Sequence, residues 1–246
     1  MTPWPYPRWI AHRGAGRLAP ENTLAAFREG ARHGWRAFEC DVKLSADGVP
    51  FLLHDATLDR TTNARGAAAA LAWSELSRLD AGGWHGRGFA GEPPASLAAI
   101  AAFVRGNGFA LNVEVKPTPG RERETGEVVA EHAVRLWAGA SVPPLLSSFQ
   151  PVALEAVRSR APQLPRALLL DALRDGWLEQ ARALDCVAVV AMYALLDAAA
   201  VARIHDAGLK ALAYTVNDPS VARWLTGNGV DGLISDAVDR FSPASD

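Results

Sequence analysis

Cysteine is scarce in this sequence, and its scarcity excludes a fold built on disulfides. The 246 residues include two cysteines, Cys40 and Cys186, which are too few for a disulfide framework. Both stand within apolar runs that look like strands. We therefore expect two buried, reduced thiols.

An excess of charge of one sign is also missing. Lysine and arginine together number 25, and aspartate and glutamate number 27, which leaves a formal net charge of -2. Such a chain has no basic surplus to hold a nucleic-acid backbone and no polybasic run for an anionic membrane. We expect a small-molecule substrate, no nucleic-acid partner and no stable membrane association.

Long apolar runs are absent as well. The longest, residues 186–196, is too short for a bilayer-spanning helix, which needs about 20 residues. Residues 1–14 lack the basic start and following apolar stretch of a secretory signal. We therefore expect a cytoplasmic protein.

What the sequence does contain is a regular alternation of short apolar runs with alanine-rich amphipathic segments. This alternation is typical of parallel strands joined by crossover helices, and the chain length is close to the ~250 residues of a (β/α)8 barrel. We expect one α/β domain over residues 1–246, a (β/α)8 or TIM barrel. The predicted strands are residues 9–11, 37–42, 110–115, 144–148, 166–170, 187–191, 210–215 and 232–235, and the predicted helices include residues 23–33, 128–137, 152–160, 198–205 and 219–225.

One segment, residues 55–94, interrupts this alternation after the second strand. It contains glycine-rich clusters, and only residues 66–76 suggest a short helix. Connections this long in a compact domain are usually functional lids or small subdomains. We expect a small insertion that narrows the substrate entrance.

The first predicted strand ends at a histidine and an arginine that suit a phosphate. His12 exchanges protons near neutral pH, and the Arg13 guanidinium offers a planar set of donors for phosphate oxygens. We expect Gly14 and Gly16 to let the backbone approach a ligand closely. Residues 20–23 read as a helix start, whose free N–H groups are expected to add attraction for anions.

Acidic residues follow on the next two predicted strands. Glu39 and Asp41 are two residues apart, so their side chains share one face while Cys40 points to the other. Glu114 and Lys116 repeat this spacing. Three converging carboxylates without histidine or cysteine suit Mg²⁺ or Ca²⁺ and are poor ligands for zinc.

His54 is the second candidate for acid/base chemistry. A turn at Asp47 and Gly48 would return it to the barrel mouth beside Glu39 and Asp41. The other four histidines, His33, His85, His132 and His205, read as surface residues. Because barrel enzymes build their sites at the C-terminal ends of strands, we expect one pocket that also includes Ser147, Ser148, Phe149, Tyr214, Asn217 and Asp236. Ser147 lacks the GxSxG context of a nucleophile elbow, which excludes a serine hydrolase of that type.

With these residues assembled, the sequence resembles the glycerophosphodiester phosphodiesterase family, most closely its bacterial cytoplasmic type. The resemblance covers nearly the whole chain. It rests on HRG with APENT in residues 12–23, ExD at Glu39 and Asp41, LLHDATLDRTTN at 52–63, DAGGW and FAGEP in the insertion, EVKP at 114–117, LLSSF at 145–149 and YTVN at 214–217.

The resemblance implies a reaction and a set of roles. The reaction is hydrolysis of a glycerophosphodiester, such as glycerophosphocholine or glycerophosphoethanolamine, to sn-glycerol 3-phosphate and an alcohol. The substrate's own glycerol 2-hydroxyl is the implied attacking group, and water then opens the cyclic phosphate. By resemblance, the catalytic acid/base pair is His12 and His54, the ligands of a divalent metal are Glu39, Asp41 and Glu114, and the substrate or phosphate contacts are Arg13, Lys116, Phe149 and Tyr214.

The chain departs from the family pattern at two places. Many relatives have threonine and glutamate where this chain reads PASLAAI from Pro94, although Ser96 can still cap a helix there. Many also have tryptophan where this chain has Tyr214, which leaves the shape of the pocket wall open.

Two other functions remain open from the sequence. One is a cyclising phosphodiester lyase of the phospholipase D-like toxin type, but those toxins are generally secreted and no signal peptide is visible here. The other is a non-catalytic barrel that binds phosphorylated polyols, which would be expected to have lost a histidine or an acid. The native ion, the preferred alcohol, the histidine that acts first and the oligomeric state also stay open.

Overall fold

Eight parallel strands form a closed barrel, as the sequence predicts. The structure is a computed structural model that describes residues 4–243. The strands follow the order β1-β9-β8-β7-β6-β5-β4-β2, and β2 pairs with β1 to close the ring. Their bounds are β1 (Trp9–Ala11), β2 (Ala37–Leu44), β4 (Ala110–Val115), β5 (Leu145–Ser148), β6 (Arg166–Leu170), β7 (Ala188–Met192), β8 (Lys210–Tyr214) and β9 (Gly232–Ser235).

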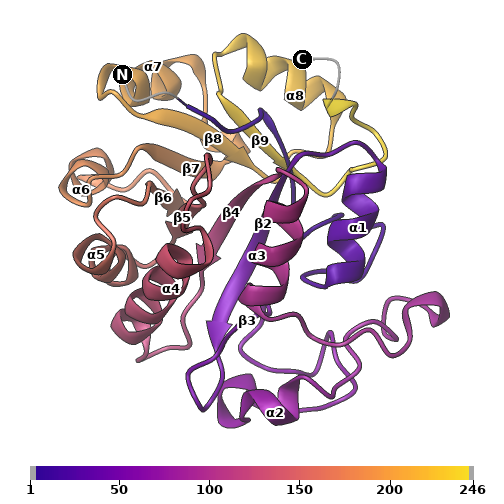
Figure 1. The fold of residues 1–246 in the computed structure, drawn as a ribbon. Helices are drawn as coiled ribbons and strands as arrows, with labels where there is room; N and C mark the ends of the chain where they lie inside the picture. Colours follow the sequence, from indigo (N-terminus) through magenta and orange to yellow (C-terminus); the bar gives the residue numbers. More distant parts are fainter. Residues whose placement is uncertain (1–3, 244–246) are drawn as a thin grey trace.

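Helices alternate with these strands and surround the barrel (Figure 1). Several begin at a side chain that accepts a backbone N–H of the first turn, namely Thr23, Ser96, Asp197 and Asp218. The helices are α1 (Leu24–Arg32), α3 (Leu97–Gly106), α4 (Glu122–Leu136), α5 (Pro151–Arg160), α6 (Trp177–Ala183), α7 (Ala198–Asp206) and α8 (Pro219–Gly227). The prediction that α4 begins at residue 128 is wrong, because the helix begins at Glu122. Its first turn is polar and lacks the periodic apolar residues that indicate a helix. The acidic residues of that turn nevertheless favour a helix N-terminus.

A ninth strand, β3 (Pro50–Leu52), was not predicted. It runs antiparallel to β2, and the two are joined by a turn at Asp47 and Gly48, where Gly48 N–H donates to the Ser45 carbonyl. This pairing extends β2 to Leu44, two residues beyond the predicted end. The hairpin returns the chain toward the end of β2, which brings His54 to the barrel mouth.

The segment between β3 and α3 packs around a small apolar cluster of its own. Phe51, Leu53, Leu58 and Leu76 are buried together in it. The short helix expected over residues 66–76 is two pieces, a 3-10 turn (Ala68–Ala70) and α2 (Trp73–Leu76), and a second 3-10 turn (Arg87–Phe89) follows. In Figure 1 this segment lies at the bottom and right of the barrel.

Strand β2 separates two cores because its side chains alternate. It is buried along its whole length. Phe38, Cys40 and Val42 pack into the layer between the sheet and the helices, whereas Ala37 packs inside the barrel. Since alternate residues share a face, Glu39 and Asp41 point into the barrel.

Substitution of Cys40 tests which side chains of β2 point into the barrel. Cys40→Ala is expected to leave kcat within a few-fold of wild type, because the thiol contacts the helical layer. Burial and the charge of Glu39 raise the pKa of the Cys40 thiol well above its usual value, so we expect no labelling by a thiol reagent at about pH 8 until the protein unfolds. A folded but inactive Cys40→Ala protein would show that the strand faces the other way.

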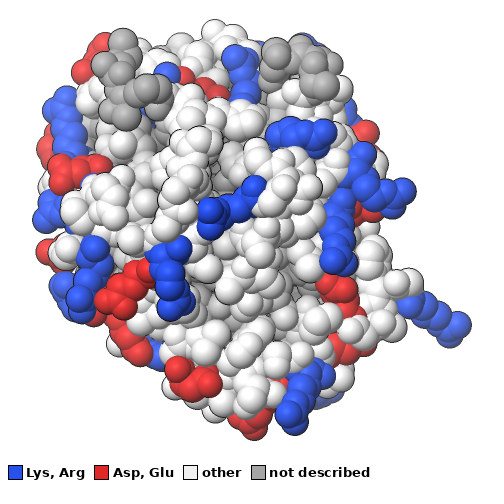
Figure 2. All heavy atoms as spheres, in the orientation of Figure 1, with Lys and Arg blue, Asp and Glu red and all other residues white. Residues whose placement is uncertain are grey.

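The surface carries charge of both signs. On the face shown in Figure 2, basic and acidic side chains are interspersed and lie mostly toward its edge. Within residues 4–243, no helix combines the length and the apolar character needed to cross a membrane.

Candidate active site

The candidate residues meet at the C-terminal ends of the strands. His12 directly follows β1, and Glu39 and Asp41 lie on β2. Glu114 on β4 is the register partner of Asp41. Asp236 directly follows β9, the other neighbour of β1.

Three carboxylates form the centre of the site. Ligand oxygens of Glu39, Asp41 and Glu114 all lie within 4.8 Å of one another, and the three side chains are buried. Burial and the charge of Asp41 raise the pKa of Glu39 to about 8 and also raise the pKa of Glu114. Within residues 4–243, Glu39 Oε1 is buried without a hydrogen-bond partner. A divalent cation that prefers oxygen ligands fits this set, because it would satisfy the orphaned oxygen and relieve the repulsion.

The loop after β1 holds two of these carboxylates in place. The Arg13 backbone N–H donates to Glu39 Oε2 at 3.0 Å. The Arg13 guanidinium lies 3.1 Å from Asp41 Oδ2 and donates to Glu21 Oε1 at 2.9 Å. Asn22 binds Asp41 twice, by donating to Oδ2 at 2.8 Å and by accepting the Asp41 backbone N–H at 3.1 Å. These partners fix the orientation of Asp41.

A second cation lies on the other side of the carboxylates. Lys116 Nζ donates to Glu114 Oε1 at 2.8 Å and lies 3.3 Å from Asp41 Oδ1. Although burial opposes the effect, Arg13 and Lys116 hold the pKa of Asp41 well below its usual value. Lys116 Nζ also lies 5.9 Å from the centre of the Phe149 ring, which meets the Tyr214 ring edge-on at 5.8 Å. The Tyr214 hydroxyl donates to the carbonyl at the end of β6.

His12 is held by an aspartate from the opposite end of the chain. Its Nδ1 lies 2.6 Å from Asp236 Oδ1, and its Nε2 lies 3.8 Å from Glu39 Oε2. Asn217 fixes Asp236 by donating to Oδ2 at 3.2 Å and by accepting the Asp236 backbone N–H at 2.8 Å. Burial alone would lower the pKa of His12, but the hydrogen bond with Asp236 and the charge of Glu39 outweigh it and raise that pKa.

His54 also has an aspartate beside it. Its Nδ1 lies 2.7 Å from Asp55 Oδ1. Burial and the nearby Arg13 charge outweigh the charge of Asp41 and lower the pKa of His54. Each histidine of the site therefore has Nδ1 engaged by a carboxylate, which leaves Nε2 as the nitrogen for proton exchange.

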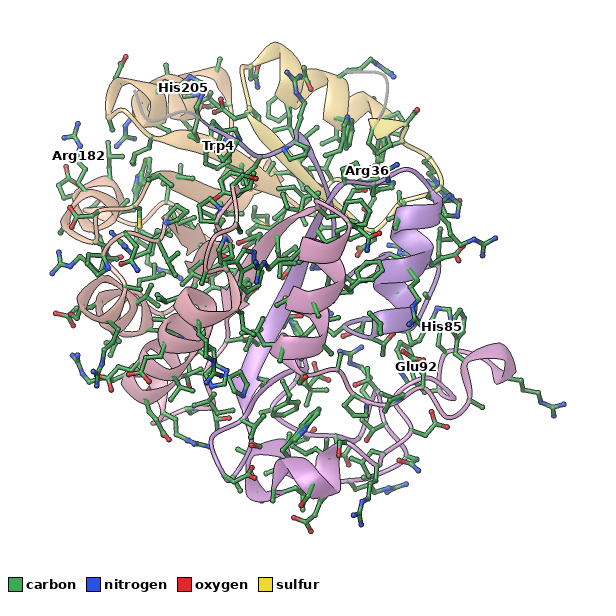
Figure 3. The ribbon with its side chains drawn as sticks, viewed as in Figure 1. Trp4, Arg36, His85, Glu92, Arg182 and His205 are labelled. Atoms are coloured by element: carbon green, nitrogen blue, oxygen red, sulfur yellow. The ribbon has the colours of Figure 1, made fainter. Side chains whose placement is uncertain are left out.

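The two glycines of the loop after β1 allow close packing within the protein, because a Cβ at Gly16 would lie 2.1 Å from the Asp236 carbonyl oxygen and one at Gly14 would meet α1. The expected attraction for anions at the start of α1 is wrong. The start of α1 is not open to anions, since the Ala25 N–H donates to the Glu92 carboxylate at 2.9 Å. Glu92 lies where the insertion passes α1 (Figure 3).

Sequence reasoning did not single out Lys43, Asp55 or Arg60. Lys43 Nζ donates to the Lys116 carbonyl at 3.2 Å, and burial together with the Lys116 charge lowers the pKa of Lys43 to about 8. It shares the face of Glu39 and Asp41, so the strand alternation could have revealed it. Asp55 and Arg60 lie inside the LLHDATLDRTTN motif, but nothing local showed their partners.

His85 and His205 have their partners outside the cluster of Glu39, Asp41 and Glu114. His85 is on the insertion and His205 on α7 (Figure 3). His205 Nε2 lies 2.8 Å from Asp231 Oδ2, and His85 Nε2 lies 3.1 Å from the Arg17 carbonyl. A groove of about 620 Å³ that runs along α3 to the C-terminal end of α4 is also separate from the site, since its lining includes Ala98, Arg105, Phe109 and Trp137.

Comparison with known proteins identifies the family. Residues 12–240 match the glycerophosphoryl diester phosphodiesterase family. This chain belongs to that family. It is 31% identical over 232 residues to a glycerophosphodiester phosphodiesterase of Caldanaerobacter subterraneus subsp. tengcongensis, covering 92% of this chain and 93% of that protein.

Two solved structures of similar proteins support this family assignment. A phosphodiesterase from Oleispira antarctica, in complex with its product sn-glycerol-3-phosphate, superposes with a TM-score of 0.90 at 34% identity and covers 98% of both chains. A glycerophosphodiester phosphodiesterase from Agrobacterium tumefaciens superposes with a TM-score of 0.81 at 30% identity, covering 96% of this chain and 99% of that one. The chain is therefore an enzyme, a glycerophosphodiester phosphodiesterase.

Proposed function

We propose that this phosphodiesterase hydrolyses glycerophosphodiesters to sn-glycerol 3-phosphate and an alcohol with the help of a divalent cation, Mg²⁺ or Ca²⁺. One observation carries the proposal. Two histidines, each oriented by its own aspartate, lie beside three buried carboxylates. The basic side chains of Arg13 and Lys116 contact these carboxylates. The product in the Oleispira antarctica complex is the product that we propose for this chain.

The chain's own residues bind and orient the phosphate. The Arg13 and Lys116 side chains contact Asp41 but remain 17% and 23% exposed, so part of each basic side chain stays accessible. Glu39, Asp41 and Glu114 would hold the cation, which when bound would neutralise negative charge on the phosphate. Phe149 and Tyr214 would form an apolar wall beside the substrate.

The two histidines move the protons. One histidine accepts at Nε2 the proton of the attacking glycerol 2-hydroxyl, while the oxygen of that hydroxyl forms a bond to phosphorus. The other histidine donates a proton from Nε2 to the oxygen of the departing alcohol, while the bond between this oxygen and phosphorus breaks. Water then opens the cyclic phosphate, and the histidines exchange roles. Proton transfer of this kind contributes roughly 10²–10⁴-fold to a rate.

We also propose that residues 55–94 narrow the entrance to the site.

Substrate range tests the internal attack. If the glycerol 2-hydroxyl is the nucleophile, the enzyme must hold the glycerol phosphate, whereas the departing alcohol needs only a proton. Choline, ethanolamine and glycerol esters are then expected to have kcat/KM values within about tenfold, a spread of roughly 1.4 kcal/mol. A 2-deoxy analogue of glycerophosphocholine should bind as a competitive inhibitor and hardly react. Rapid hydrolysis of that analogue would show that a water molecule is the nucleophile.

A further inference from the structure

Arg60 joins two carboxylates at the mouth of the barrel. Its Nη1 and Nη2 each donate to one oxygen of Glu21 at 2.8 Å. Its Nε donates to Asp55 Oδ2 at 2.7 Å, and Nη2 also donates to Asp55 Oδ1 at 3.0 Å. A planar guanidinium can bond two carboxylates in this way, whereas a compact ammonium cannot.

Each of these carboxylates also contacts a residue of the proposed site. Glu21 Oε1 accepts a hydrogen bond from Arg13 Nη1 at 2.9 Å, and Asp55 Oδ1 lies 2.7 Å from His54 Nδ1. An unbroken chain of contacts therefore runs from Arg13 through Glu21, Arg60 and Asp55 to His54. It connects the loop after β1 with the loop after β3, two segments that backbone pairing does not join directly.

The chain of contacts has a direct consequence for the His54 ring. The hydrogen bonds from Arg60 hold the pKa of Asp55 and of Glu21 below their usual values, so both stay ionised. An ionised carboxylate only accepts hydrogen bonds, which places the proton of neutral His54 on Nδ1. Exposed ion pairs contribute little to stability, and the Arg60 side chain is 44% exposed. An effect of Arg60 on stability alone would therefore be small.

We propose that Arg60 is a positioning residue, which fixes Asp55 and through it the orientation and tautomer of His54 relative to Arg13. The proposal rests on the proposed role of His54 in proton transfer. In this role Arg60 acts through the two carboxylates, because four of its five guanidinium N–H groups donate to Glu21 and Asp55.

Kinetics of Arg60 variants test the proposal. Arg60→Ala and Arg60→Lys are each expected to lower kcat about ten- to a hundredfold, a loss similar to that caused by removing an outer-shell partner of a metal-bound histidine. The KM for glycerophosphocholine should change less than about threefold, since Arg13 and Lys116 remain. Free guanidinium ion should restore part of the activity of Arg60→Ala. The control is Arg32→Ala on α1, which removes an exposed arginine paired with Glu29 and should behave as wild type with or without guanidinium.

The ¹⁵N NMR signals of the His54 ring test the positioning role of Arg60 independently of enzyme activity. Wild type and Arg32→Ala should show a protonated Nδ1 and a bare Nε2, and both Arg60 variants should show a mixture of tautomers. His54→Ala identifies the signals. Wild-type kcat in both Arg60 variants, or a lowered kcat with an unchanged tautomer, would overturn the proposal. If His54→Ala stays active, the acid/base assignment fails, while the tautomer measurement still decides what Arg60 does. If Arg60→Ala does not fold, the same measurements on Arg60→Lys decide the proposal.

Discussion

The His12→Ala and His54→Ala enzymes are each expected to turn over glycerophosphocholine at least about a hundredfold more slowly than wild type. Each substitution removes an imidazole whose Nδ1 is held by a carboxylate and whose Nε2 is left for proton exchange. Neither removes a carboxylate of the central cluster, Arg13 or Lys116. The loss should therefore fall on kcat, and the affinity for sn-glycerol 3-phosphate should remain within a few-fold of wild type.

Steady-state kinetics and product-binding calorimetry separate these two effects. His132→Ala is the matched control, because His132 is a half-exposed histidine on α4 whose ring contacts Arg135. The His132→Ala substitution should leave kcat unchanged.

Activity within about tenfold of wild type in a folded His12→Ala or His54→Ala protein would refute acid/base catalysis by that histidine.

Removal of divalent cations is expected to abolish turnover. The carboxylates of Glu39, Asp41 and Glu114 form a set of oxygen ligands in a buried site, and without a cation none of them could neutralise negative charge on the substrate phosphate. Exhaustive treatment with EDTA should reduce the rate to background, and Mg²⁺ or Ca²⁺ should restore it. Full activity after this treatment would contradict the proposed metal dependence.

Glu114→Gln tests the same site without a chelator. The side chain keeps its size but loses its charge, so the cation should bind more weakly and the rate should fall while the protein remains folded. Calorimetric titration with Mg²⁺ and with Ca²⁺ measures the change in affinity. Glu131→Gln, which replaces an exposed glutamate on α4, should bind the cation as wild type does. If zinc alone restored the activity of the metal-free enzyme, the metal ligands would have to differ from Glu39, Asp41 and Glu114.

Much of the barrel is readable from the sequence because buried parallel strands need short continuous apolar runs. The predicted strand at residues 110–115 has the same bounds as β4, and that at 166–170 the same bounds as β6. Alternation along β2 also places Glu39 and Asp41 on one face and Cys40 on the other, which the two cores bear out. These features follow from local chain geometry alone.

Contacts between distant loops could not be read in this way. The Asp236 carboxylate that orients His12 is 224 positions away in the chain, and only closure of the barrel between β1 and β9 brings them together. The same closure places the Asp236 backbone against Gly16. The Glu92 carboxylate that occupies the start of α1 comes from the insertion, whose path lacks the periodicity that makes strands and helices predictable.

Phosphorus NMR of the purified protein with glycerophosphocholine tests the central claim most directly. With Mg²⁺ or Ca²⁺ present, we expect the phosphodiester signal to give way to that of sn-glycerol 3-phosphate. With EDTA, we expect the phosphodiester signal to persist unchanged. Conversion that proceeds equally in EDTA, or that stops at a cyclic phosphate, would contradict the proposed metal-dependent hydrolysis.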